Sequence, residues 1–214
     1  MRVLATVCSK GGVGKTTTTA NLGGLLADAG LRVLLIDLDS QPTLSSYYEL
    51  SPAMGGVYEL LATELVDLDQ IISHTVIPNL DIIVSNDYRN QLQQLLLNAP
   101  NGRFRLIDLL DRFADRYDAI LIDTQGARSV MLEMAVMAAD RLISPIVPVQ
   151  STMSPRCLDY QVIGGCAWRH CSLWGYRVRA SVRARAFQRG CWVIFVRPQA
   201  NFWLCSGAKC APIS

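Results

Sequence analysis

Cysteine is nearly absent from the first 156 residues, where Cys8 stands alone, and this absence limits the kinds of metal site that the chain can hold. Of the seven cysteines in 214 residues, none lies between Cys8 and Cys157. This gap excludes an iron–sulfur cluster ligated by cysteines from the middle of the chain, since such clusters are held by cysteine thiolates. The six later cysteines include no C-x-x-C pair, so their spacing does not favour a zinc site near Cys166, His170 and Cys171.

Long apolar runs and targeting signals are also missing. No apolar run reaches the roughly 18–20 residues that span a bilayer. The opening segment MRVLATV is too short for a secretory signal, because charged and glycine-rich sequence follows at once. We therefore expect a cytoplasmic protein with reduced thiols.

Charge is distributed unevenly along the chain. Residues 1–150 carry 11 Lys+Arg and 17 Asp+Glu, a balance of −6, whereas residues 151–214 carry 9 Lys+Arg and one acid, Asp159, a balance of +8. All four tryptophans and six of the seven cysteines lie after Gln150. We therefore predict two regions, a folded domain over residues 1–150 and an atypical Arg-, Cys- and Trp-rich tail over residues 151–214.

Short apolar segments alternate with helical patterns in the first 150 residues. Near-continuous apolar strands between helices are typical of a parallel sheet covered on both faces. The sequence therefore predicts an α/β fold with a mainly parallel sheet and helices on both faces. An amphipathic helix is expected over residues 104–118, and CWVIFV in the tail could form a strand. The other strands are expected at Arg2–Cys8, Leu31–Asp39, Leu80–Ser85, Ala119–Asp123 and 141–149.

The stretch CSKGGVGKTTTTANLG, residues 8–23, has the features of a phosphate-binding loop. It follows a predicted strand and opens a helix, and its glycines let backbone N–H groups approach phosphate oxygens. The strict pattern G-x-x-x-x-G-K-[ST] would require glycine where the chain has Ser9. Lys15 would contact the β- and γ-phosphates, and the Thr16 hydroxyl would reach Mg²⁺. The residues expected to bind the nucleotide are Gly11, Gly12, Val13, Gly14, Lys15, Thr16 and Thr17.

The loop resembles the deviant Walker A motif of the ParA/MinD family of P-loop ATPases, which carries a second lysine before the glycines. Lys10 occupies that place in KGGVGKTTTTANLG. The resemblance implies an ATP-dependent homodimer in which Lys10 reaches the partner's nucleotide, by analogy with an arginine finger supplied in trans. The alternative is a solvated surface lysine, although Lys10 and Lys15 are the only lysines in residues 1–150.

Two further motifs match the same family. VLLIDLDSQPT, residues 33–43, is similar to the family's D-x-D-P-Q segment, with Ser40 in place of the proline. This implies that Asp39 lies by the attacking water and Mg²⁺; a helix cap or loop carboxylate is the alternative. AILIDTQGA, residues 119–127, resembles a Walker B strand, which implies that Asp123 holds Mg²⁺ through water together with Thr16.

The resemblance extends from Met1 to about Val149, and the tail carries no family feature. We hypothesise that a frameshift near codon 150 replaced the native C-terminus and left the sheet incomplete; a divergent native tail is the alternative. The nine basic residues of the tail could bind nucleic-acid phosphates. A basic membrane helix of the MinD kind is not favoured, because the arginines do not segregate from an apolar face at Arg177, Arg179, Arg183 and Arg185.

The resemblance as a whole implies a ParA-type partition ATPase of the Soj-like group, in which no helix-turn-helix precedes the loop. Its cofactors would be ATP and Mg²⁺, and its partners a second copy, a ParB-type protein and non-specific DNA. The alternatives are a MinD-like membrane-cycling ATPase and a truncated remnant that binds nucleotide weakly or not at all. The implied catalytic residues are Lys10, Lys15 and Asp39, and the implied metal-binding residues are Thr16, Asp39 and Asp123.

Overall fold

The computed structural model describes residues 1–8, 11–63, 67–127 and 129–146, together with the backbone of four strands in the tail. Lys10 lies outside the described residues, and so does the segment that contains Cys166, His170 and Cys171. The tail strands are β8 (Arg183–Ala186), β9 (Trp192–Val196), β10 (Trp203–Ser206) and β11 (Lys209–Pro212).

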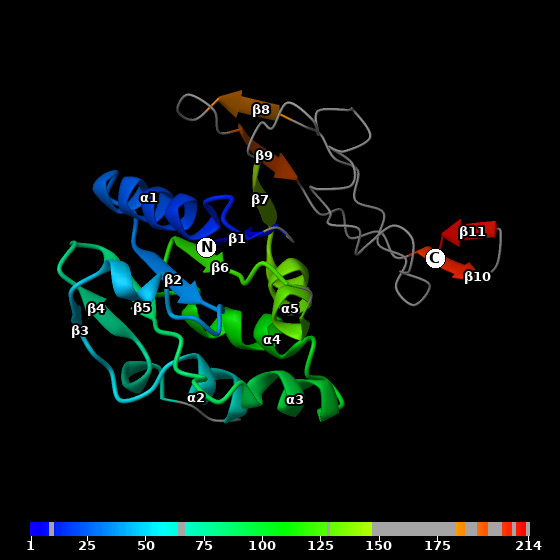
Figure 1. Ribbon diagram of the computed structural model, residues 1–214, viewed down its shortest axis with the longest axis horizontal. Coiled ribbons are helices and arrows are strands. Elements are labelled where there is room, and N and C mark those ends of the chain that lie inside the picture. The colour runs from blue at the N-terminus through cyan, green and yellow to red at the C-terminus, as the bar shows by residue number, and fades with distance from the viewer. Residues whose placement is uncertain are drawn as a thin grey trace.

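Five parallel strands form the centre of a mixed sheet (Figure 1). Each pair of neighbours within this group runs in the same direction. All five coincide with strands that the sequence predicts, so the mainly parallel sheet is confirmed. In spatial order they are β5 (Leu80–Ile83), β2 (Val33–Asp37), β6 (Ala119–Asp123), β1 (Arg2–Thr6) and β7 (Arg141–Ile146).

Antiparallel strands extend both edges of this parallel group. On one side β5 pairs with β4 (Ser73–Thr75), which pairs with β3 (Leu50–Ser51). The sequence did not predict these two strands, because segments of three and two residues carry no periodic pattern. On the other side β7 pairs with β9, and β9 with β8. The strand expected at CWVIFV is therefore confirmed as β9, whereas β10 and β11 form a separate two-stranded pair.

Helices cover both faces of the sheet, as predicted (Figure 1). On β2, Val33 and Leu35 pack in the core cluster on the side of α1 (Lys15–Asp28), whereas Leu34 and Ile36 pack in the larger cluster on the opposite face. This alternation is the period of two expected for a strand covered on both sides. The helices of the larger cluster are α2 (Val57–Ala62), α3 (Gln91–Asn98), α4 (Arg105–Leu110) and α5 (Val130–Ala138).

The amphipathic helix predicted over residues 104–118 is shorter than expected. Its α-helical part, α4, ends at Leu110 and continues as the 3₁₀ helix η3 (Asp111–Phe113). The amphipathic character is confirmed, because the apolar residues Leu106, Leu109, Leu110 and Phe113 are all buried. Two other 3₁₀ helices in the described residues are η1 (Ser45–Tyr47) and η2 (Leu68–Gln70).

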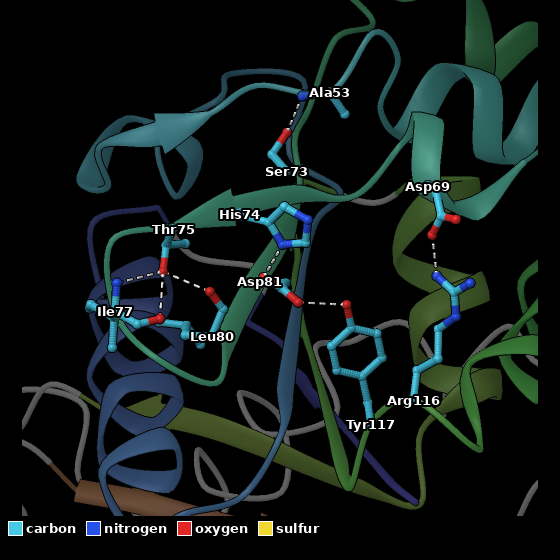
Figure 2. Close-up of polar contacts among 10 residues, drawn as sticks. All are labelled: Ala53, Asp69, Ser73, His74, Thr75, Ile77, Leu80, Asp81, Arg116 and Tyr117. Carbon is cyan, nitrogen blue, oxygen red and sulfur yellow. Dashed lines mark hydrogen bonds and ion pairs between the residues drawn. The ribbon is translucent and has the colours of Figure 1, made fainter.

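Polar contacts join the antiparallel edge to the amino ends of the parallel strands (Figure 2). Asp81 on β5 accepts a hydrogen bond from the Tyr117 hydroxyl at 2.8 Å and lies 2.8 Å from Nδ1 of His74 on β4. The Thr75 hydroxyl donates to the carbonyl of Leu80 at 2.6 Å. Burial, followed by the hydrogen bond to Asp81, raises the pKa of Tyr117. The network thus fixes the end of the sheet opposite to the glycine loop.

Candidate functional site

The glycine loop joins β1 to α1 through a backbone turn that favours glycine. Gly12 and Gly14 have φ values of 71° and 83°, in the left-handed region that residues with a Cβ rarely adopt. Gly14 is the N-cap residue of α1, and no side chain caps the helix there. The first N–H groups of α1 are therefore directed toward the loop, as in anion-binding helix N-termini. Gly11 and Thr17 are exposed, whereas Val13 is buried.

Lys15 begins α1 and is buried, with 8% of its surface exposed. The segment that follows β6 approaches it closely at Gly126. A Cβ at position 126 would lie 3.4 Å from the Lys15 ammonium and 3.3 Å from the backbone nitrogen of Gly11. The close approach of this segment to the glycine loop therefore leaves little room for a side chain at position 126. The sequence contained the signal, a glycine three residues after Asp123, but Gly126 was not predicted as a site residue.

Asp123 ends β6 beside the loop and is completely buried. Its Oδ1 accepts a hydrogen bond from the Thr19 hydroxyl at 3.4 Å, and the Thr16 side chain lies near enough to lower the pKa of Asp123. Thr19 is also 2.8 Å from the hydroxyl of Thr6. Burial raises the pKa of Asp123 to about 6, while the Thr16 hydrogen bond and the charge of Lys15 act in the opposite direction. The structure thus brings together three predicted site residues, Lys15, Thr16 and Asp123.

Asp37 is a second buried acid at this site. It ends β2 and is the register partner of Asp123 on the neighbouring strand β6. Burial raises the pKa of Asp37 to about 7, and the charge of Asp123 adds to the effect, whereas hydrogen bonds from Ser45 lower it. The sequence prediction selected Asp39 and left Asp37 without a role. The signal was available, because Asp37 is the first acid at the carboxyl end of a predicted parallel strand.

Asp39 lies in the loop after β2 and is partly buried. Its Oδ1 accepts a hydrogen bond from the backbone of Gln41 at 3.0 Å. Its charge contributes to the raised pKa of Asp123, so the loop brings Asp39 close to the buried acids. Of the three predicted metal-binding residues, Thr16 and Asp39 both influence the pKa of Asp123: Thr16 lowers it and the charge of Asp39 raises it.

The residues around Asp123 fit a hard divalent cation. Among the described residues, Oδ2 of Asp123 has no hydrogen-bond partner although it is buried. A buried carboxylate oxygen without a partner is energetically costly unless a ligand satisfies it. Oxygen donors from an aspartate and a threonine at a helix N-terminus are ligands that suit Mg²⁺ together with phosphate oxygens. Thr16 and Asp123 could therefore hold such an ion beside a phosphate bound in the loop.

The strand–glycine loop–helix unit on a parallel sheet defines a P-loop NTPase, and comparisons with known proteins agree. A family model described as an AAA domain matches residues 1–155. The sporulation initiation inhibitor protein Soj of Bacillus subtilis is 33% identical over 147 residues, which cover 68% of this chain and 58% of Soj. The chain belongs to this AAA-domain family and, within it, to the ParA/MinD family of P-loop ATPases.

Two solved structures show the same fold. A plasmid partition protein from Borrelia burgdorferi is 29% identical, with a TM-score of 0.62, over 74% of this chain and 70% of its own. Cobyrinic acid a,c-diamide synthase from Mycobacterium smegmatis, solved with an ATP analog and magnesium, is 27% identical, with a TM-score of 0.65, over 75% and 65% of the two chains. The present chain spans about half the length of the curated relatives it matches. None of the helices within the described ranges has the length and apolar character needed to cross a bilayer.

Proposed function

We propose that this chain is a Mg²⁺-dependent ATPase of the ParA type, which acts in the cytoplasm in plasmid, chromosome or mobile-element partition. The observation that carries the proposal is the group formed by the buried Lys15 and Asp123 with the partly buried Thr16, in which one carboxylate oxygen of Asp123 lacks a partner among the described residues. Support for the biological role comes from the names of its relatives, which include a chromosome partitioning protein ParA from Myxococcus xanthus and the Borrelia plasmid partition protein.

The residues of the site divide the chemistry between phosphate binding and water positioning. The backbone N–H groups of Gly11–Thr17 would bind phosphate oxygens. The buried Lys15 ammonium would stabilise the negative charge of the β- and γ-phosphates. Thr16 and Asp123 would hold Mg²⁺, which would supply positive charge to offset that of the phosphates. Asp39 would orient the attacking water from the loop after β2. Phosphoryl transfer requires little covalent chemistry from the protein, so catalysis here is positioning and electrostatics.

For the mechanism of this ATPase we propose an ATP-dependent switch. In it, two copies associate when ATP is bound, and Lys10 of each copy supplies positive charge to the nucleotide of the other. The dimer would bind non-specific DNA, and a ParB-type protein would stimulate hydrolysis. DNA binding would associate the protein with the nucleoid. The support for this switch is the family membership and the position of Lys10 in the glycine loop.

Phosphate release and sedimentation of the full chain test this proposal together. We expect slow turnover in wild type that DNA and a cognate partner increase, and a dimer only with ATP and Mg²⁺. Lys15→Ala should abolish turnover by removing charge from the phosphate site. Lys10→Ala should retain ATP binding but remain a monomer. ATP-dependent vesicle binding without DNA binding would support a MinD-like cycle instead, and a wild type that neither binds nor hydrolyses ATP would support a remnant.

We infer that residues 1–150 form the nucleotide-binding domain and that residues 151–214 are a segment of different origin. The support is the charge imbalance of the tail and the end of the family match at residue 155. β9 of the tail nevertheless pairs with β7 at the sheet edge. Translation of the gene in its other two frames after codon 150 tests a frameshift. A frame that restores ParA-like sequence is the expected result, and its absence from both frames would contradict the inference.

A further inference from the structure

We propose that Ser45 and Ser85 are positioning residues for Asp39, because their hydroxyls join the loop that carries Asp39 to the ends of β2 and β5. The inference rests on the proposed function, since it assigns a supporting role for the residue that would orient the attacking water. Ser45 and Ser85 have no other role in the proposed nucleotide site.

A closed ring of hydrogen bonds links these four residues. Asp37 Oδ2 accepts from the Ser45 backbone N–H at 2.9 Å and from the Ser45 hydroxyl at 2.7 Å. The Ser45 hydroxyl in turn accepts from the backbone N–H of Ser85 at 3.3 Å. The Ser85 hydroxyl donates to the backbone carbonyl of Asp39. The backbone N–H of Asp39 donates to Asp37 Oδ1 at 3.3 Å, which closes the ring.

The ring fixes Asp39 from both sides of its own peptide. Its N–H is held by the buried Asp37, and its carbonyl is held by Ser85, which is only 4% exposed. The end of the loop is anchored by Leu44, which is completely buried, and by Ser45. Within the loop, the Gln41 N–H bonds the Asp39 carboxylate at 3.0 Å and sets its direction. With both backbone groups of Asp39 held, the side chain has few positions from which to reach a water near the γ-phosphate.

A merely stabilising role for these serines is distinguishable from a positioning role. Ser46 provides a matched control in η1, because its hydroxyl donates to the carbonyl of Thr43 at 2.7 Å and is not part of the ring. A stabilising role would change folding alone. A positioning role would change the turnover number while ATP affinity stays the same, since the four residues of the ring lie outside the glycine loop in the sequence.

The experiment compares Ser45→Ala, Ser85→Ala and Ser46→Ala in the full chain. Hydrogen exchange of the peptide that covers residues 38–45 should rise about fivefold or more in the first two variants, the equivalent of one net hydrogen bond. Turnover should fall about five- to tenfold at an ATP affinity within about twofold of wild type. Ser45→Thr, which retains the hydroxyl, should recover most of the turnover.

Each outcome decides one of the two proposals. Exchange and turnover that match Ser46→Ala would overturn the positioning role, and so would a loss of ATP affinity as large as the loss of turnover. A wild type without turnover would instead refute the proposed ATPase, while the exchange data still report whether the ring orders the loop. If Ser85→Ala fails to fold in a thermal melt, Ser45→Ala carries the same comparison, because Ser45 is only partly buried.

Discussion

Replacement of Asp123 by asparagine should stabilise the nucleotide-free protein in a pH-dependent way. The folded-state pKa of Asp123 is raised from 3.8 to about 6, chiefly by burial. Because the folded pKa lies above the unfolded one, folding is penalised once the carboxylate ionises. The penalty is absent well below the unfolded pKa, grows as the pH rises from about 4 to about 6, and is complete above that.

The magnitude follows from the size of the shift. A difference of about two pKa units corresponds to a folding penalty of roughly 3 kcal/mol. About 2 kcal/mol of this penalty develops as the pH rises from about 4.5 to about 8. Asparagine cannot ionise, so this part of the pH dependence should vanish in Asp123→Asn. For a chain of this length the difference between variant and wild type should grow by roughly 4–8 °C in melting temperature over that range.

Thermal melts in EDTA across that pH range measure the effect, and Asp108→Asn, at an exposed position on α4, is the control. The control should show no pH-dependent gain. With Mg²⁺ and ATP present, wild type should melt at a higher temperature than Asp123→Asn, because ligand binding stabilises only the protein that can bind it. A difference between Asp123→Asn and wild type that stays constant with pH, or that shrinks as pH rises, would refute the assignment of Asp123 as a buried acid held at energetic cost.

Two further predictions concern the packing around the site and the opposite end of the sheet. Gly126→Ala should weaken ATP binding by at least about fivefold, because the added Cβ would lie 3.4 Å from the Lys15 ammonium and the crowded loop must shift. Unchanged affinity in a calorimetric titration would contradict this. Tyr117→Phe should lower the free energy of unfolding in urea by about 1–2 kcal/mol, because it removes the 2.8 Å hydrogen bond to Asp81, and a change within error would show that solvent replaces that bond at no cost.

Much of the fold could be predicted because the parallel strands carry unmistakable patterns. Each central strand is a continuous apolar segment, and the glycine loop sits where a strand becomes a helix. β3 and β4 were missed because pairing of so few residues depends on neighbouring strands rather than on local sequence. The helix at 104–118 was predicted too long, because the apolar period that buries Phe113 persists through the 3₁₀ turn that ends it.

The site was predicted in part for a similar reason. Lys15, Thr16 and Asp123 sit at fixed spacings in motifs, so their chemistry can be inferred from position alone. Asp37 and Gly126 were missed because their roles arise from contacts between strands and loops. Asp37 matters through its register with Asp123 on the neighbouring strand, and Gly126 through the space that its missing side chain leaves.

The central claim is that this chain binds ATP with Mg²⁺ in the glycine loop, and calorimetric titration of the full chain with ATP tests it most directly. We predict one ATP bound per chain in the presence of Mg²⁺ and markedly weaker binding in EDTA. We also predict no measurable binding by Lys15→Ala, although this variant should retain the wild-type melting temperature. Binding by Lys15→Ala equal to that of wild type, or a folded wild type that releases no heat with ATP and Mg²⁺, would contradict the claim.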